Sequence, residues 1–166
     1  MLFRRTYPRV RAYLARQVGA EHAEDAVSET MIRAVRGIDR FELGPGGFDP
    51  WLFGIARRVA VDHHRRAGRL RRQDVAAAAL DAGGDGGIEG PGERLVIGEE
   101  QAELRRAFAR LTPGEQEVLE LRVVAELSAD EAAVVLGKAP GAVRTAQSRA
   151  LSRLRQLLDA ERAGRR

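Results

Sequence analysis

The chain has 166 residues and a formal net charge of +4, with 28 arginine and lysine residues against 24 acidic ones. It contains no cysteine, which excludes disulfides, thiolate metal sites and cysteine nucleophiles. No apolar run approaches the roughly 18 residues that span a bilayer, and the basic N-terminus lacks the apolar stretch of a signal peptide. We therefore expect a cytoplasmic protein without membrane insertion.

The first part of the chain shows helical periodicity. A first helix is expected over about residues 3–18 and a second over 21–37, separated by a glycine. A glycine-rich loop follows. The third helix is expected to start with Asp49 as N-cap and Pro50 at its first position, where the missing N–H costs nothing. These elements form an expected N-terminal domain over residues 1–72.

A change in composition follows the third helix. Residues 73–93 are rich in glycine and alanine, with five acids and no base, which is typical of a flexible acidic linker. Helical periodicity resumes over residues 94–166, the expected C-terminal domain. Its first helix is expected over 94–111, and a capping box at Thr112-Pro113-Gly114-Glu115 opens a second helix that reaches Val124.

The most informative stretch is the helix-turn-helix pattern near the C-terminus. Ser128 to Glu131 form a capping box, Gly137 supplies a left-handed helix stop, and Pro140 fits the first turn of the next helix. The second helix of such a motif enters the DNA major groove. Its expected outer face carries four residues that suit base and phosphate contacts: Arg144, Thr145, Ser148 and Arg149.

Seven of the eight aromatic residues fall in the first 53 positions. Phe41, Phe48 and Trp51 flank the glycine-rich loop, where either core packing or stacking on unpaired bases fits them. His63 and His64 point about 100° apart on a helix, so they do not suit one metal ion, and we expect no metal site and no cofactor. The acids at Glu24, Asp25 and Glu29 favour a solvated or partner-binding helix face over a catalytic group.

These segments resemble, in order, the two conserved regions of small bacterial sigma factors of the extracytoplasmic-function type. YPRVRAYL, AEDAVSETMIRAVRGIDRF and DPWLFGIARRVAVDHHRR resemble region 2 of the sigma-70 family. LTPGEQEVLELRVVAELSADEAAVVLG and PGAVRTAQSRALSRLR resemble region 4. Departures include Ser28 in place of a frequent glutamine, Arg58 in place of asparagine, and Gln147 in place of an aliphatic residue.

The resemblance implies a protein that binds core RNA polymerase and directs it to promoter DNA, without enzymatic activity. It implies a polymerase-binding face on the second helix formed by Asp25, Ser28, Glu29 and Arg33. It implies minus-ten contacts by Phe41, Phe48, Trp51, Arg57, Arg58, His64 and Arg65. The helix-turn-helix residues would then read the minus-thirty-five element, and an anti-sigma factor is an expected partner.

The expected fold is all-α. Two small helical domains are joined by a flexible linker, and the C-terminal one is a four-helix domain with a helix-turn-helix. An alternative function is a stand-alone helix-turn-helix regulator, which would bind operator DNA tightly by itself, usually as a dimer. No dimerisation helix is evident in the sequence, so we expect a monomer when the protein is free of partners.

Overall fold

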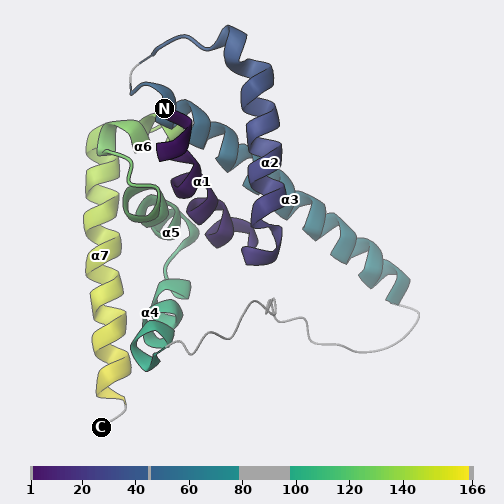
Figure 1. The fold of residues 1–166 in the computed structure, drawn as a ribbon. Coiled ribbons are helices and arrows are strands. Elements are labelled where there is room, and N and C mark those ends of the chain that lie inside the picture. Colours follow the sequence, from purple (N-terminus) through teal and green to yellow (C-terminus); the bar gives the residue numbers. More distant parts are fainter. Residues whose placement is uncertain (1, 45, 79–97, 165–166) are drawn as a thin grey trace.

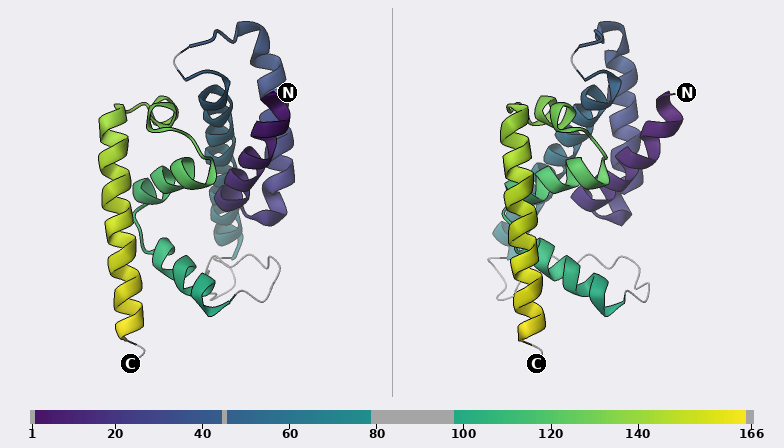
Figure 2. Two further views of the ribbon diagram at one scale, coloured as in Figure 1. Left: turned by 60° about the vertical axis from the view of Figure 1, so that its left-hand side comes forward. Right: turned by 90° about the vertical axis from the view of Figure 1, so that its left-hand side faces the viewer.

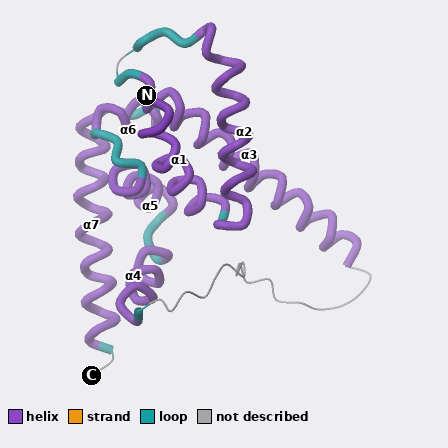
Figure 3. Tube along the Cα trace, in the orientation of Figure 1, coloured by secondary structure: helices purple, strands orange, loops and turns teal. Residues whose placement is uncertain are grey.

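The structure is a computed structural model that describes residues 2–44, 46–78 and 98–164 (Figure 1). No strand occurs among these residues, which form helices, loops and turns (Figure 3). The elements in chain order are α1 (Leu2–Val18), α2 (Ala20–Gly37), the 3-10 turn η1 (Ile38–Arg40), α3 (Phe48–Ala78), α4 (Glu99–Ala109), α5 (Pro113–Leu119), the π-helical turn η2 (Glu120–Val124), α6 (Ala129–Leu136) and α7 (Pro140–Ala163). The expected all-α fold with two helical domains is confirmed.

The N-terminal unit consists of α1, α2 and α3, and its core follows the helical period. Val10 and Leu14 lie one turn apart on α1 and are fully buried. The ring of Tyr13 meets that of Phe53 from α3 edge to face, with 5.6 Å between the ring centroids. Each such buried side chain contributes about 1.5–3 kcal/mol to folding. Gly19 has φ +90°, which permits the sharp turn between α1 and α2.

The C-terminal unit consists of α4 to α7, and its local signals are those expected from the sequence. Both capping boxes are formed, with Thr112 and Glu115 at the start of α5 and Ser128 and Glu131 at the start of α6. Gly137 ends α6 with φ +62° in the left-handed region. A helix of two turns is unstable alone, so these caps and the buried face of α6 hold it in place.

The two units pack against each other and share one apolar core (Figure 2). α6 and the start of α3 lie side by side, and α1 contacts η2. The guanidinium of Arg9 on α1 donates from Nε and Nη2 to the carbonyl oxygen of Ala125, at 2.8 and 2.5 Å. Arg57 on α3 pairs with Glu117 on α5 at 2.5 Å. The second half of α3 projects from this packed body (Figure 1).

Two local expectations are wrong. The third helix begins at Phe48, before the expected N-cap Asp49. The carboxylate of Asp49 instead accepts hydrogen bonds from Thr6 Oγ1 at 2.9 Å and Arg9 Nη1 at 2.5 Å. The helix expected to reach Val124 divides at Leu119 into α5 and a π turn, and Val123 in that turn is 60% exposed.

The domain limits stay predictions. α3 continues to Ala78, beyond the expected boundary at residue 72. Most of the expected linker, residues 79–93, lies outside the described residues, as does the expected start of the first C-terminal helix at residue 94. The described part of that helix, α4, begins at Glu99 after Gly98.

Candidate nucleic-acid interface

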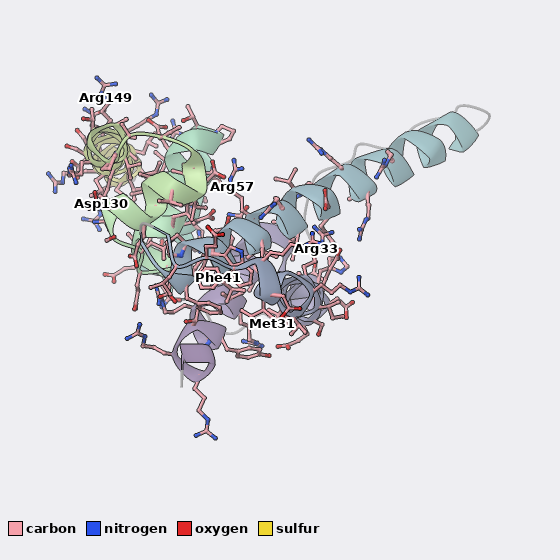
Figure 4. All side chains as sticks on the ribbon, turned by 90° about the horizontal axis from the view of Figure 1, so that it is seen from above. Met31, Arg33, Phe41, Arg57, Asp130 and Arg149 are labelled. Carbon is pink, nitrogen blue, oxygen red and sulfur yellow. The ribbon has the colours of Figure 1, made fainter. Side chains whose placement is uncertain are left out.

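The exposed face of α7 carries the residues expected to read DNA. Val143 and Ala150 are fully buried on the inner side of this helix. The opposite side presents Arg144, Thr145, Ser148 and Arg149, all of them exposed. Arg149 points away from the packed helices (Figure 4). Because α7 has no acidic residue before Asp159, this face is basic and can approach phosphates and guanine edges.

Three aromatic rings gather at the loop before α3. The ring centroid of Phe41 lies 4.8 Å from that of Trp51 and 5.9 Å from that of Phe48, and the Phe48 and Trp51 centroids are 5.5 Å apart. All three rings are half-buried, so each keeps some surface open to solvent. Gly46 and Gly47 have φ values of +94° and +80°, which only glycine adopts without strain. The rings pack against one another, which agrees with core packing as one interpretation of the sequence. Each ring also keeps exposed surface on which an unpaired base can stack, which agrees with the other interpretation.

A small apolar hollow adjoins this cluster. Its volume is about 140 Å³, and its lining comes from α2, η1 and α3. Met31 and Phe41 mark this side of the N-terminal unit in Figure 4. The lining residues are Met31, Ala34, Val35, Ile38, Phe48, Trp51 and Leu52. The hollow and the three rings together form an apolar surface beside the loop.

The basic residues of α3 do not act as one group. Arg58, His64 and Arg65 are exposed, and Arg58 Nε donates to the carbonyl of Gly54 at 3.1 Å. Arg57 instead turns to the C-terminal unit, where its hydrogen bond with Glu117 raises the pKa of its guanidinium. Of the residues expected at the minus-ten element, Arg57 is therefore the one held by a carboxylate of the other unit.

The polar side of α2 is partly tied to α3. Asp25 and Ser28 are exposed, as expected for a partner-binding face. Arg33 bridges Glu29 at 2.5 Å and Asp62 on α3 at 2.9 Å (Figure 4). Burial alone would raise the pKa of Glu29, but hydrogen bonds from Arg33 and a second arginine outweigh it and lower that pKa. Arg33 therefore orients the acid and only partly faces solvent.

Two exposed apolar residues on α2 were not predicted from the sequence as part of this face. Ile32 is 52% exposed and Val35 is 72% exposed. Ile32 follows Ser28 by four residues and Asp25 by seven, and Val35 follows Ser28 by seven, so all four lie along one side of the helix. A large aliphatic side chain outside the core stripe of α2 is the signal that could have found them. The expected polymerase-binding face is thus apolar as well as acidic.

The described parts of the chain contain neither a metal-binding cluster nor a membrane-spanning helix. No three His, Asp or Glu side chains there are grouped so that they could hold a metal ion. His22 and His63 lie close, with 4.8 Å between their ring centroids, but they lack a third ligand of this kind. None of the helices formed by these residues has the length and apolar character needed to cross a membrane.

Two family models match the chain in the order expected. Residues 2–70 match Sigma-70 region 2, and residues 101–154 match Sigma-70 region 4. The first match covers α1 to most of α3, and the second covers α4 to the first half of α7. Each model therefore coincides with one helical unit.

Curated relatives carry both regions. The chain is 37% identical over 148 residues to the ECF RNA polymerase sigma factor BldN of Streptomyces coelicolor. That match covers 88% of this chain but 54% of BldN, so the chain spans about half the length of that relative. It is 34% identical to the ECF RNA polymerase sigma factor ShbA of Streptomyces griseus, over 82% of this chain and 71% of that protein.

Solved structures show the same arrangement of helices. The sigma factor RpoE from Bartonella quintana, solved in complex with the anti-sigma factor NepR, superimposes with a TM-score of 0.69 at 26% identity, covering 95% of this chain and 94% of that one. CnrH, solved in complex with the cytosolic domain of CnrY, gives a TM-score of 0.62 at 26% identity, with 96% and 86% covered. On its sequence and its fold, the chain belongs to the family of ECF RNA polymerase sigma factors.

Proposed function

We propose that this protein binds core RNA polymerase and directs it to promoters, acting in the cytoplasm as an initiation factor and not as an enzyme. The observation that carries the proposal is the presence of both sigma regions on one chain. Each region also has an exposed surface whose chemistry suits nucleic acid, the basic face of α7 and the aromatic cluster before α3. α7 would read the minus-thirty-five element through Arg144, Thr145, Ser148 and Arg149. The aromatic cluster at Phe41, Phe48 and Trp51 would receive an unpaired base of the minus-ten element, with Arg58, His64 and Arg65 on nearby phosphates.

The α2 surface would bind the polymerase. Asp25 and Ser28 supply polar contacts, and Ile32 and Val35 supply apolar area whose burial stabilises a complex. Glu29 and Arg33 act as an oriented pair beside them. An anti-sigma factor is the second partner we propose, because RpoE was solved with one; it would cover this surface and the DNA-reading face of α7.

Promoter binding would require the two units to separate. The minus-ten and minus-thirty-five elements lie about 25 base pairs apart, which is roughly 85 Å of DNA. A compact chain of this length is about 40 Å across, and even the longest helix, α3 with 31 residues, is only about 46 Å long. Since the units share a core and the Arg9 contact to Ala125, the packed form cannot place both surfaces on one promoter. The packed form is therefore a resting state that polymerase binding opens.

Separation would also free Arg57 for DNA. In the packed form the carboxylate of Glu117 occupies this guanidinium in the way that a phosphate would. Arg57 can therefore bind a DNA phosphate only after its ion pair with Glu117 has broken. The same chain thus offers fewer cations to DNA when it is free than when it is bound to polymerase.

The experiment that tests the proposal is capture of purified core RNA polymerase by the tagged protein. We expect wild type to capture polymerase in a one-to-one complex, and we expect the double variant Asp25→Lys, Val35→Asp to lose at least tenfold in affinity. Glu42→Lys changes an exposed charge in the loop after η1, outside α2, and serves as the matched control. Tight operator binding by the free protein, without capture of polymerase, would instead support a stand-alone regulator.

A further inference from the structure

Arg122 lies in the π-helical turn that interrupts the second helix of the C-terminal unit. In this turn the N–H of Ala125 bonds the carbonyl of Glu120 at 2.8 Å, so one more residue is accommodated than in an α-helical turn. Such turns change the direction of the side chains that follow and occur frequently at functional sites. Here Leu121 is fully buried, Val123 is turned to solvent, and Arg122 is half-buried between them.

The guanidinium of Arg122 joins three segments of the C-terminal unit. It lies on η2, and its Nη1 donates to the carbonyl of Leu127, the residue before the cap of α6. Its Nε donates to Oε1 of Gln147 on α7 at 2.8 Å. One cation therefore holds the end of the second helix, the start of the third and the DNA-reading helix together. Removal of the Arg122 side chain would leave the Leu127 carbonyl and the Gln147 side-chain oxygen without their charged donor.

Gln147 lies on α7 at the border between the buried and the exposed faces of this helix. It adjoins Ser148 in the sequence and lies three residues after Arg144. The fully buried residues nearest to it, Val143 and Ala150, are small apolar side chains, so a hydrogen bond at Gln147 adds a directional constraint to the apolar packing of the helix. At a side-chain radius of about 6 Å, a rotation of about 15° moves a contact by roughly 1.6 Å. A hydrogen bond tolerates a spread of only about 0.5 Å.

We propose that Arg122 is a positioning residue for reading the upstream promoter element, and that it acts through Gln147. The bond between them fixes the rotation of α7 and so determines which base edges Arg144 and Arg149 reach. It gives a physical reason for a glutamine at a position where the family usually has an aliphatic residue. The proposal rests on the function proposed above, because it presumes that α7 reads promoter DNA.

The test measures promoter discrimination by holoenzyme reconstituted with the full chain. Transcription is measured from two promoters, one that this holoenzyme recognises and a copy of it with a scrambled minus-thirty-five element. The readout is the amount of transcript from the intact promoter divided by the amount from the scrambled one. Gln147→Leu and Arg122→Met should each lower the ratio about tenfold, and the double variant should lower it no further than either alone. Gln147→Glu keeps an acceptor for Arg122 and should keep the wild-type ratio. The negative charge that Gln147→Glu adds is repelled by DNA phosphates. Because the phosphate backbone is the same in both promoters, this repulsion cancels in the ratio.

Gln156→Leu is the matched control, because Gln156 is an exposed glutamine on the same helix. It should retain the wild-type ratio. Thermal unfolding of each variant separates positioning from stability, since a purely structural role changes the melting temperature without changing the ratio. A wild-type ratio in Gln147→Leu overturns the proposal, as does an equal loss in Gln147→Leu and Gln147→Glu. A wild-type holoenzyme without any discrimination overturns the proposed function together with this inference.

Discussion

The contact between Arg9 and Ala125 offers a direct way to separate the two helical units. Arg9→Met keeps most of the aliphatic stem but removes both donors to the Ala125 carbonyl. Its side chain is only 16% exposed, so water replaces these bonds poorly. The two donors share one carbonyl, and we count them as one charge-assisted bond of about 1.5–3 kcal/mol. The equilibrium constant for separation should therefore rise about 10- to 150-fold.

The separation can be measured as a distance between spin labels in the free protein. Because the chain has no native cysteine, Arg36→Cys on α2 and Arg155→Cys on α7 place one label on each unit at exposed residues. Double electron–electron resonance should show one narrow distance distribution in the parent. Added Arg9→Met should populate a second, broad distribution.

The control separates the effect on the interface from an effect inside the N-terminal unit. Arg9 also bonds Asp49, and Thr6 donates to the same carboxylate. Thr6→Val removes that bond and keeps the Arg9 donors to the Ala125 carbonyl, so it should leave the narrow distribution of the parent in place. A distance distribution in Arg9→Met that matches both the parent and Thr6→Val would refute the reasoning, because the bonds to Ala125 would then contribute nothing to closure.

Three further outcomes are expected. Glu117→Gln should weaken the partly exposed pair with Arg57 by about 0.5–1 kcal/mol, and so raise the affinity of the free protein for single-stranded minus-ten DNA two- to fivefold, as measured by fluorescence anisotropy. Arg149→Ala should cost about 1–3 kcal/mol at one upstream base pair, seen by comparing holoenzyme on promoters that differ at that pair. Burial, aided by the charge of His22, lowers the pKa of His63 in the folded protein. The stability that neutral His63 contributes is therefore complete above its unfolded-state pKa of about 6.5, and it is lost as the pH falls through the lower folded-state pKa. Urea unfolding at successive pH values should show this slope in wild type and a weaker one in His63→Phe.

Local signals in the sequence predicted the C-terminal unit well. The capping boxes at Thr112 and Ser128, the left-handed Gly137 and Pro140 each depend on neighbours within a few residues. Short-range chemistry of this kind can be read from the sequence without knowledge of the tertiary fold. The exposed face of α7 followed from helical period alone.

Contacts between distant segments could not be predicted in this way. Asp49 looks like an N-cap, but it bonds Thr6 and Arg9, some forty residues earlier in the chain. The π turn at Glu120–Val124 could not be predicted from the spacing of apolar residues, because its geometry depends on packing against other elements. The Arg57 pair with Glu117 joins residues 60 positions apart, on units whose relative placement the sequence does not encode locally.

The central claim is that this chain gives core RNA polymerase its promoter specificity, and run-off transcription from a genomic library tests it most directly. Core polymerase with the wild-type chain should produce discrete transcripts whose start sites share two sequence elements about 25 base pairs apart. The double variant Arg144→Ala, Arg149→Ala should lose dependence on the upstream element while it still captures polymerase. Transcripts identical to those of core polymerase alone, from a chain that is folded, would contradict the account.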